Sequence, residues 1–187
     1  HAGWTKMRAL ATSDRMGTAR YISQQIRYSL LDRACENELL PLGVNEGVGA
    51  LIWGPLASGY LSGKFRTKDA AEGTRLGSRG SLDAMDNDHT RGVIAAVEAI
   101  AQARGVSLSQ VALNWVARQA GVASILIGAR TTTQLEDNLG AAGWSLTDEE
   151  VARLSEASAV APIYPYDMHA HFMGERKPKA GLLRGIA

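Results

Sequence analysis

Short apolar stretches alternate along the chain with segments of helical periodicity. Three stretches rich in β-branched and aromatic residues predict strands: Tyr21–Leu31, Val48–Trp53 and Val122–Ile127. Apolar positions three and four residues apart predict helices before, between and after them: Gly3–Arg15, Arg33–Asn45, Gly92–Arg104, Ser109–Gln119 and Thr132–Ala142. Strands that are nearly continuous apolar runs, separated by helices, indicate an α/β protein with a parallel sheet whose faces are covered.

Several helix starts carry the pattern of a capping box, in which a Ser or Thr hydroxyl and a Glu or Gln three residues later each bond the other's backbone N–H. The pattern occurs at three places: Ser107 with Gln110, Thr131 with Gln134, and Thr147 with Glu150. The last of these predicts a further helix from Thr147 onward.

The remaining segments are polar. Phe65–His89 is rich in Gly and Ser and predicts a long functional loop, and a Pro-rich tail begins at about Ala161. Three strands are few, since a typical sheet has about five or six. Either long loops take up the rest of the chain, or the chain is part of a larger sheet, and the pattern favours the second. In that case we expect unpaired strand edges and an open sheet face, which favour association.

Composition narrows the class of protein. Of 187 residues, 45% are hydrophobic and 21% charged, with a net charge of +1, which is typical of a globular domain and excludes a disordered chain or a strongly basic nucleic-acid binder. No apolar run reaches membrane-spanning length and no secretory signal is visible, so we expect a cytoplasmic protein. Because the chain begins at His1 in a helical pattern, we expect that its true N-terminus is missing.

Ligands of parallel sheets bind beyond the carboxyl ends of the strands, and the first polar candidates lie in the first predicted strand. Gln24 and Gln25 are adjacent there and are followed by Arg27, Tyr28 and Ser29. Two neighbouring glutamines are unusual in a buried strand. Each is equally well explained as a ligand contact or as a structural hydrogen-bonding group.

The second candidate is the loop that follows Trp53. The strand ends at this tryptophan, turns through Gly54 and Pro55, and enters a run of small residues that extends to Lys64. Such loops bring backbone N–H groups close to an anion. The indole can stack on a planar ring, but spacing alone favours a core position for a tryptophan.

The third candidate is the segment from Ile127 to Asn138, in which a strand leads through a glycine into a helix that starts with threonines. The free N–H groups and the positive end of that helix favour an anion, and the guanidinium of Arg130 suits a phosphate. A capped helix start at Thr131 is compatible with this role.

Other motifs carry no chemistry. Gly47-Val-Gly49 lacks the third glycine of a dinucleotide fingerprint and precedes its strand. His169 and His171 are too few for a metal site on their own. Cys35 is the only cysteine, which excludes an internal disulfide, and its acidic neighbours should raise its pKa and make it unreactive. No catalytic triad, Cys/His pair or carboxylate pair is recognisable, so we predict neither a catalytic residue nor a metal in this chain.

Taken together, the motifs resemble those of the aldo-keto reductase superfamily, in its branch related to aryl-alcohol dehydrogenases and potassium-channel β subunits. The resemblance runs from His1 to about Val160 and is specific because the motifs occur in order. They are Gln25-Ile-Arg-Tyr-Ser-Leu-Leu-Asp-Arg33, Trp53-Gly-Pro-Leu-Ala-Ser-Gly-Tyr-Leu-Ser-Gly-Lys64, Glu72-Gly-Thr-Arg75, Gln110-Val-Ala-Leu-Asn-Trp115 and Ile127-Gly-Ala-Arg-Thr-Thr-Thr-Gln-Leu-Glu-Asp-Asn138.

The resemblance implies a fold and a cofactor. Residues 1–160 would be the C-terminal half of a (β/α)₈ TIM barrel, supplying its last three strands with the surrounding helices, and residues 161–187 a tail. The cofactor would be NADP(H). Gln25 would bind the nicotinamide carboxamide and Trp53 would stack on the nicotinamide ring.

The same resemblance assigns the remaining cofactor contacts. The pyrophosphate would be held by Gly54, Leu56, Ser58 and Lys64, where Gly54 replaces a serine that is usual in the family. The 2′-phosphate would meet Arg75, Arg130 and Gln134, and adenine would meet Asp137 and Asn138. The two cofactor loops add four further expected contacts, Pro55, Ala57, Gly128 and Ala129.

The family's catalytic Tyr, Lys, Asp and His lie in the first half of the barrel, and no residue of this chain matches them. The resemblance therefore implies an inactive fragment of an enzyme that reduces small carbonyl compounds and that requires its missing N-terminal half. An alternative is a cofactor-sensing regulatory subunit with little turnover. A third, a complete small α/β domain with another binding function, fits the order of the motifs poorly.

Overall fold

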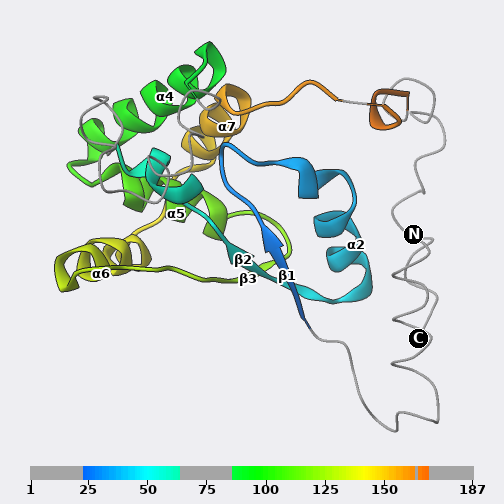
Figure 1. The fold of residues 1–187 in the computed structure, drawn as a ribbon, viewed down its shortest axis with the longest axis horizontal. Coiled ribbons are helices and arrows are strands. Elements are labelled where there is room, and N and C mark those ends of the chain that lie inside the picture. Colours follow the sequence, from blue (N-terminus) through cyan, green and yellow to red (C-terminus); the bar gives the residue numbers. More distant parts are fainter. Residues whose placement is uncertain (1–22, 64–85, 163, 169–187) are drawn as a thin grey trace, which may run out of the picture.

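The computed structural model describes residues 23–63, 86–162 and 164–168. In chain order, these contain β1 (Ser23–Arg27), η2 (Ala34–Asn37), α2 (Leu39–Glu46), β2 (Gly49–Trp53), η3 (Ala57–Ser62), α4 (Asp88–Arg104), α5 (Leu108–Ala117), β3 (Val122–Ile125), α6 (Thr132–Gly140), η6 (Ala141–Gly143) and α7 (Asp148–Ala157). Figure 1 shows α4, α5 and α7 packed together and α2 set apart from them. The predicted helix Gly3–Arg15 lies outside the described residues.

The three predicted strands form one parallel sheet in the order β1-β2-β3. Ser23 pairs with Gly49 and Arg27 with Trp53, and a register shift between Ala50 and Leu51 interrupts the pairing with β3. Within the described residues β1 and β3 are the two outer strands, as predicted for an open arc.

The first predicted strand is shorter than expected. It ends at Arg27, because the chain turns back on itself through reciprocal backbone hydrogen bonds between Ser29 and Asp32, each 3.1 Å long. The third strand likewise ends at Ile125, two residues early. Tyr28 and Leu126 still donate their backbone N–H groups to Trp53 and Ile52 of β2, at 3.3 and 2.7 Å, but the apolar residues after them do not continue the pairing. Hydrophobicity alone therefore overestimated both strands.

The predicted helix Arg33–Asn45 is divided into η2 and α2 at Glu38, whose φ of −141° is not helical. Pro41 explains the break, because its ring clashes with the carbonyl of the residue four positions earlier in a continuous helix. With a new start at Leu39, the proline falls in the first turn, where it is tolerated.

Helix α4 begins four residues before its predicted start at Gly92, so the end of the predicted loop Phe65–His89 is helical. Asn87 caps the helix, and its side chain accepts a hydrogen bond from the Thr90 N–H at 2.9 Å.

The three predicted capping boxes have different outcomes. The box of Thr147 and Glu150 is confirmed in both directions. Ser107 accepts from the Gln110 N–H, but the Gln110 side chain reaches Asp137 instead of returning to its cap. At α6 the Thr131 cap forms, and the Gln134 side chain accepts from the N–H of Arg130, one residue before the cap.

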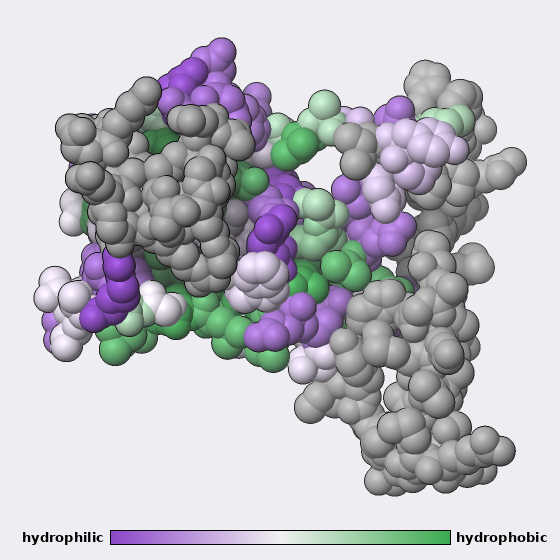
Figure 2. Space-filling view, in the orientation of Figure 1, coloured by the Kyte–Doolittle hydropathy of each residue, from purple (hydrophilic) through white to green (hydrophobic). Residues whose placement is uncertain are grey.

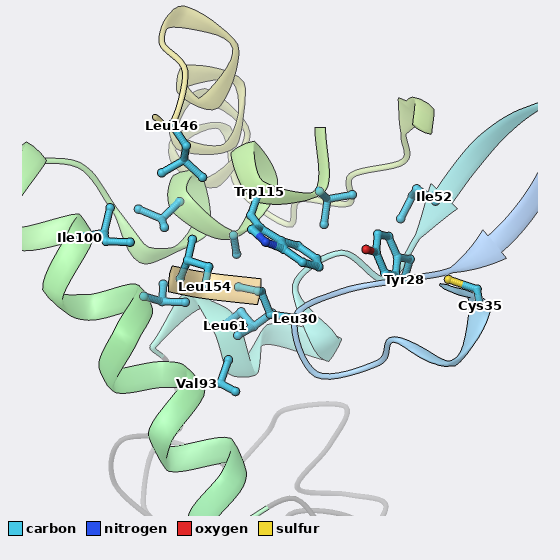
Figure 3. Close-up of a cluster of buried hydrophobic side chains, with 14 of the residues drawn as sticks. Tyr28, Leu30, Cys35, Ile52, Leu61, Val93, Ile100, Trp115, Leu146 and Leu154 are labelled. Atoms are coloured by element: carbon cyan, nitrogen blue, oxygen red, sulfur yellow. The ribbon is translucent and has the colours of Figure 1, made fainter. Parts of the chain in front are cut away.

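The core lies between one face of the sheet and the helices (Figure 3). Side chains of β1 and β2 alternate: Ile26, Ala50 and Ile52 are buried among the helices, whereas their neighbours in sequence are not. Trp115 of α5 is fully buried against Tyr28, with ring centroids 5.4 Å apart. One layer of helices therefore covers one face of the sheet.

Among the described residues, the opposite face of the sheet, called the open face below, is largely exposed. Gln25, Arg27, Trp53 and Ser124 on this face are all exposed. Leu126, directly after β3, and Leu135 and Leu139 of α6 are 41%, 41% and 56% exposed. Figure 2 shows apolar surface along this edge of the molecule, over β3 and the segment that leads to α6. An apolar patch beside an unpaired strand edge favours association.

We expect residues 1–187 alone to associate in solution, and the double substitution Leu135→Gln and Leu139→Gln to shift them toward monomer. Size-exclusion chromatography with light scattering measures the change. The control is Val160→Gln, which removes an apolar side chain that is 61% exposed and follows the end of α7.

A wild-type monomer with strongly protected amides in all three strands contradicts this expectation. It would mean that the chain is a domain in its own right.

Candidate functional site

The carboxyl ends of the three parallel strands lie at one edge of the sheet, and two of the predicted cofactor segments leave from there. The loop that starts at Gly54 follows β2, and the segment from Leu126 to Thr131 follows β3 and leads into α6. Because β2 and β3 are neighbours, these two segments start side by side. The sequence prediction that places both at one edge is therefore confirmed by the topology.

Trp53 is the last residue of β2 and is 45% exposed, so the core position favoured by spacing alone is wrong. It lies on the open face, because the side chains of Ala50 and Ile52 occupy the covered one. The guanidinium carbon of Arg27 is 5.7 Å from the centroid of the Trp53 ring, and Arg27 also forms an ion pair with Asp32. The indole thus presents a flat aromatic surface at the carboxyl end of the sheet.

The two adjacent glutamines have different surroundings. Gln24 points toward the helices, where its Nε2 donates to the Leu39 carbonyl at 2.8 Å and its buried Oε1 has no partner. Its amide also lies so close to Gly43 that a Cβ there would be 2.6 Å from Nε2. Gln24 is therefore structural. Gln25 is exposed on the open face, the same face as Trp53.

The loop after Trp53 has an unusual backbone. Gly54 has φ of 67°, and Ala57 and Ser58 have φ of 47° and 58° although they carry side chains. Such conformations are strained for residues other than glycine and cluster at ligand sites. Two backbone hydrogen bonds hold the turns of this loop. The Ala57 N–H donates to the Gly54 carbonyl at 3.0 Å, and the Gly59 N–H donates to the Leu56 carbonyl at 2.8 Å.

The segment before α6 is exposed from Gly128 to Thr133, including Arg130. The Arg130 N–H donates a hydrogen bond of 3.0 Å to the Gln134 side chain, which holds the backbone of Arg130 against the first turn of α6. Arg130 thus directly precedes the N-cap of α6, and an arginine beside the positive end of a helix suits a phosphate.

Asp137 and Asn138 lie deeper than the other predicted contacts. The Asp137 carboxylate accepts from the Ser107 hydroxyl at 2.9 Å and from the Gln110 amide at 3.0 Å, so it ties α6 to the start of α5. Asn138 is buried. Both side chains therefore contribute to the packing of α6 in the protein, independently of any ligand contact.

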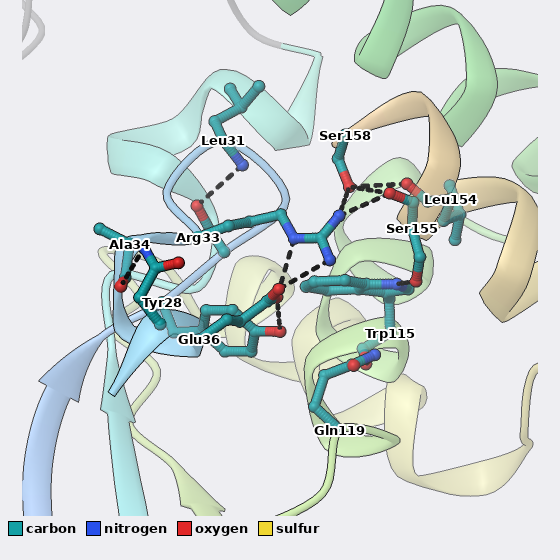
Figure 4. Close-up of polar contacts among 12 residues, drawn as sticks. Tyr28, Leu31, Arg33, Ala34, Glu36, Trp115, Gln119, Leu154, Ser155 and Ser158 are labelled. Atoms are coloured by element: carbon teal, nitrogen blue, oxygen red, sulfur yellow. Dashed lines mark hydrogen bonds and ion pairs between the residues drawn. The ribbon is translucent and has the colours of Figure 1, made fainter. Parts of the chain in front are cut away.

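A partly buried polar network lies at the carboxyl end of β1 (Figure 4). Glu36 accepts from the Tyr28 hydroxyl at 2.5 Å and from Arg33 Nε and Nη2 at 2.7 and 2.8 Å. Arg33 also donates to the Ser155 carbonyl and the Ser158 hydroxyl and lies over the ring of Trp115. Burial, aided by the Glu36 carboxylate, raises the pKa of Tyr28 above its ordinary value. Tyr28 is thus a structural hydrogen-bond donor.

Comparison with known proteins identifies the family. The family model described as "Aldo/keto reductase family" matches residues 2–159. The chain belongs to this family. It is 33% identical over 153 residues to the uncharacterized oxidoreductase YrpG of Bacillus subtilis (strain 168) and 33% identical over 160 residues to Protein tas of Escherichia coli (strain K12). It is also 31% identical over 137 residues to a probable voltage-gated potassium channel subunit beta of Arabidopsis thaliana.

These matches cover 82%, 86% and 71% of the chain, but only 45%, 45% and 42% of the relatives. The chain thus spans less than half the length of these aldo/keto reductase relatives. The family implies a (β/α)₈ barrel, and a three-stranded parallel sheet with helices on one face is consistent with part of such a barrel.

Two residues predicted from the family motifs, Lys64 and Arg75, lie outside the described residues. So do His169 and His171, which the sequence analysis rejected as a metal site. In the described ranges no cluster of His, Cys, Asp or Glu could hold a metal ion. Nor does any helix there have the length and apolar character to cross a membrane.

Arg27 is the residue of the candidate site to which the sequence prediction gave no role. It was recognisable only as a charged residue in an apolar strand. Its contact with Trp53 depends on the register of β1 against β2, which sequence patterns do not give.

Cys35 is buried in η2, as expected for an unreactive thiol. Burial, and then the neighbouring Glu36 carboxylate, raises the pKa of its thiol from 9.0 to about 12. The thiolate, which is the nucleophilic form, is therefore scarce at neutral pH.

We expect Ellman's reagent to label Cys35 at pH 8 only when the protein opens, with a large rate increase in urea. Because the folded pKa is raised, the thiol contributes stability that is complete below pH 9 and declines as the pH rises from 9 toward 12. Urea unfolding of wild type and Cys35→Ala from pH 8 to 10.5 measures this decline, which should be smaller in the variant. Rapid labelling of the folded protein contradicts the assignment.

Proposed function

We propose that this chain is the cofactor-binding half of an NADP-dependent oxidoreductase that reduces aldehydes and ketones to alcohols. The observation that carries the proposal is the arrangement at the carboxyl edge of the sheet. The exposed indole of Trp53 and the exposed amide of Gln25 lie on the open face. The strained loop of small residues follows β2, and the segment with the exposed Arg130 follows the neighbouring strand β3 and leads into α6. The family, whose model matches residues 2–159, supports the same chemistry.

The described residues fit such a cofactor in chemical type. Trp53 offers a flat surface for the nicotinamide ring, and Gln25, on the same face, offers an amide for the carboxamide. The backbone from Gly54 to Ser58 suits a pyrophosphate, and Arg130 with Gln134 and the α6 N-terminus suits the 2′-phosphate. Lys64 and Arg75 are proposed to add positive charge, and Gly128 and Ala129 to allow close approach.

When bound, the cofactor supplies the hydride, and this chain binds and orients it. We propose that the proton donor lies in a preceding half of the barrel, because no residue here matches the family's catalytic set. The carbonyl substrate, and a dependence of the chain on that preceding half, are parts of the same proposal, as is a cytoplasmic location. Residues 1–160 would form the barrel portion and residues 161–187 a tail.

A second candidate is a cofactor-sensing subunit with little turnover. The observation that favours it is the similarity to the probable potassium channel subunit beta of Arabidopsis thaliana. Both candidates require cofactor binding at the same edge, and they differ in whether the full-length protein turns over a carbonyl substrate.

We expect Arg130→Ala in the full-length protein to weaken NADPH binding about 10- to 100-fold and NADH binding little. A charged hydrogen bond to the extra phosphate contributes about 1.5–3 kcal/mol, and NADH lacks that phosphate. Fluorescence titration with both cofactors measures the two affinities. Arg153→Ala, which removes an exposed arginine from α7, is the control. Equal losses for both cofactors exclude Arg130 as a 2′-phosphate ligand.

We expect residues 1–187 alone to show no carbonyl reductase activity. Without a placed proton donor the developing alkoxide is not stabilised, even where the cofactor binds. An assay with NADPH and an activated aromatic aldehyde, followed at 340 nm, decides this. Sustained turnover that is abolished by substitution of a residue in this chain would contradict the proposal.

A further inference from the structure

Arg27 holds a positive charge against the aromatic surface of the candidate site. It is the last residue of β1 and pairs in register with Trp53, the last residue of β2. Both side chains point to the open face, and the guanidinium lies over the indole ring at 5.7 Å. The positive charge of Arg27 therefore lies close to any aromatic ring that stacks on Trp53.

Two contacts keep the guanidinium there although its side chain is 61% exposed. The ring attracts the cation from one side, and the Asp32 carboxylate pairs with it from another. An arginine serving only as a solvated surface charge needs none of these contacts.

We propose that Arg27 sets the redox-state preference of the site, so that the reduced nicotinamide cofactor is bound in preference to the oxidised one. This inference rests on the proposed function. The oxidised nicotinamide ring carries a positive charge and the reduced ring is neutral. A fixed cation beside Trp53 repels the first and leaves the second unaffected.

Asp32 sets the strength of this effect. The Asp32 carboxylate forms an ion pair with the Arg27 guanidinium and so partly offsets its charge. The guanidinium also contacts the Trp53 ring, and that contact does not involve Asp32. Removal of the Asp32 charge should therefore strengthen the preference for the reduced form, and removal of the Arg27 charge should abolish it. For unit charges about 6 Å apart in a partly hydrated site, the expected effect on relative affinity is about three- to tenfold.

The test is the ratio of the dissociation constants of NADP⁺ and NADPH, measured in the full-length protein at low ionic strength by quenching of tryptophan fluorescence. We expect Arg27→Met to lower this ratio about three- to tenfold, mainly by tighter binding of NADP⁺. Arg27→Lys, which keeps the charge, should retain most of the ratio, and Asp32→Asn should raise it.

The matched control is Arg118→Met. Arg118 is also an arginine paired with an aspartate, Asp148, but it lies between the end of α5 and the start of β3, at the opposite edge of the sheet. This variant should leave the ratio unchanged. Circular dichroism of each variant shows whether it is folded.

The outcomes separate the two proposals. If Arg27→Met changes both affinities by the same factor, or if Arg27→Lys behaves like Arg27→Met, the role of the charge is wrong while cofactor binding stands. If wild type binds neither form of the cofactor, the proposed function itself is wrong.

Discussion

The placement of the described elements depends on the requirement that the largely buried guanidinium of Arg33 be fully satisfied. It donates to Glu36 in η2 and to Ser155 and Ser158 at the end of α7, and it stacks on Trp115 of α5. A buried charge that loses its partners destabilises a protein by several kcal/mol. The turn after β1 is therefore held against two helices that are distant in sequence.

That constraint also fixes the site. Because the end of β1 is held in place, Arg27 and Trp53 meet on the open face while Tyr28 is directed into the core. The strict alternation of a strand then separates two functions in adjacent residues: Gln24 anchors α2, and Gln25 remains available on the open face. Two neighbouring polar side chains in one strand thus serve packing and binding independently.

The parts of the structure that depend on local interactions were predictable from the sequence. The three strands, their parallel arrangement and the capping box at Thr147 follow from periodicity and cap chemistry, and all are confirmed. The early start of α4 at Asp88 was missed because its cap, Asn87, lies in a run of polar residues that predicts a loop. The division at Glu38 was missed although Pro41 signals it.

The parts that depend on distant contacts were not predictable. The exposure of Trp53 and its contact with Arg27 depend on strand register, and the pairing of Asp137 with Ser107 and Gln110 depends on how α5 and α6 pack. Family motifs identified candidate cofactor residues but gave no information on which side chains already have structural partners.

The bonds between Arg33 and the end of α7 join residues 122 and 125 positions apart. During synthesis Arg33 therefore leaves the ribosome well before its partners exist. At about 5–20 residues per second this interval is roughly 6 to 25 seconds. Glu36, only three residues later, can pair with the charge early, but the Nη1 donors of Arg33 have no acceptor from α7 until Ser155 and Ser158 exist. Burial of the turn after β1 against α7 is therefore a late event, and a chain that stops before Ser155 lacks two of the acceptors of Arg33.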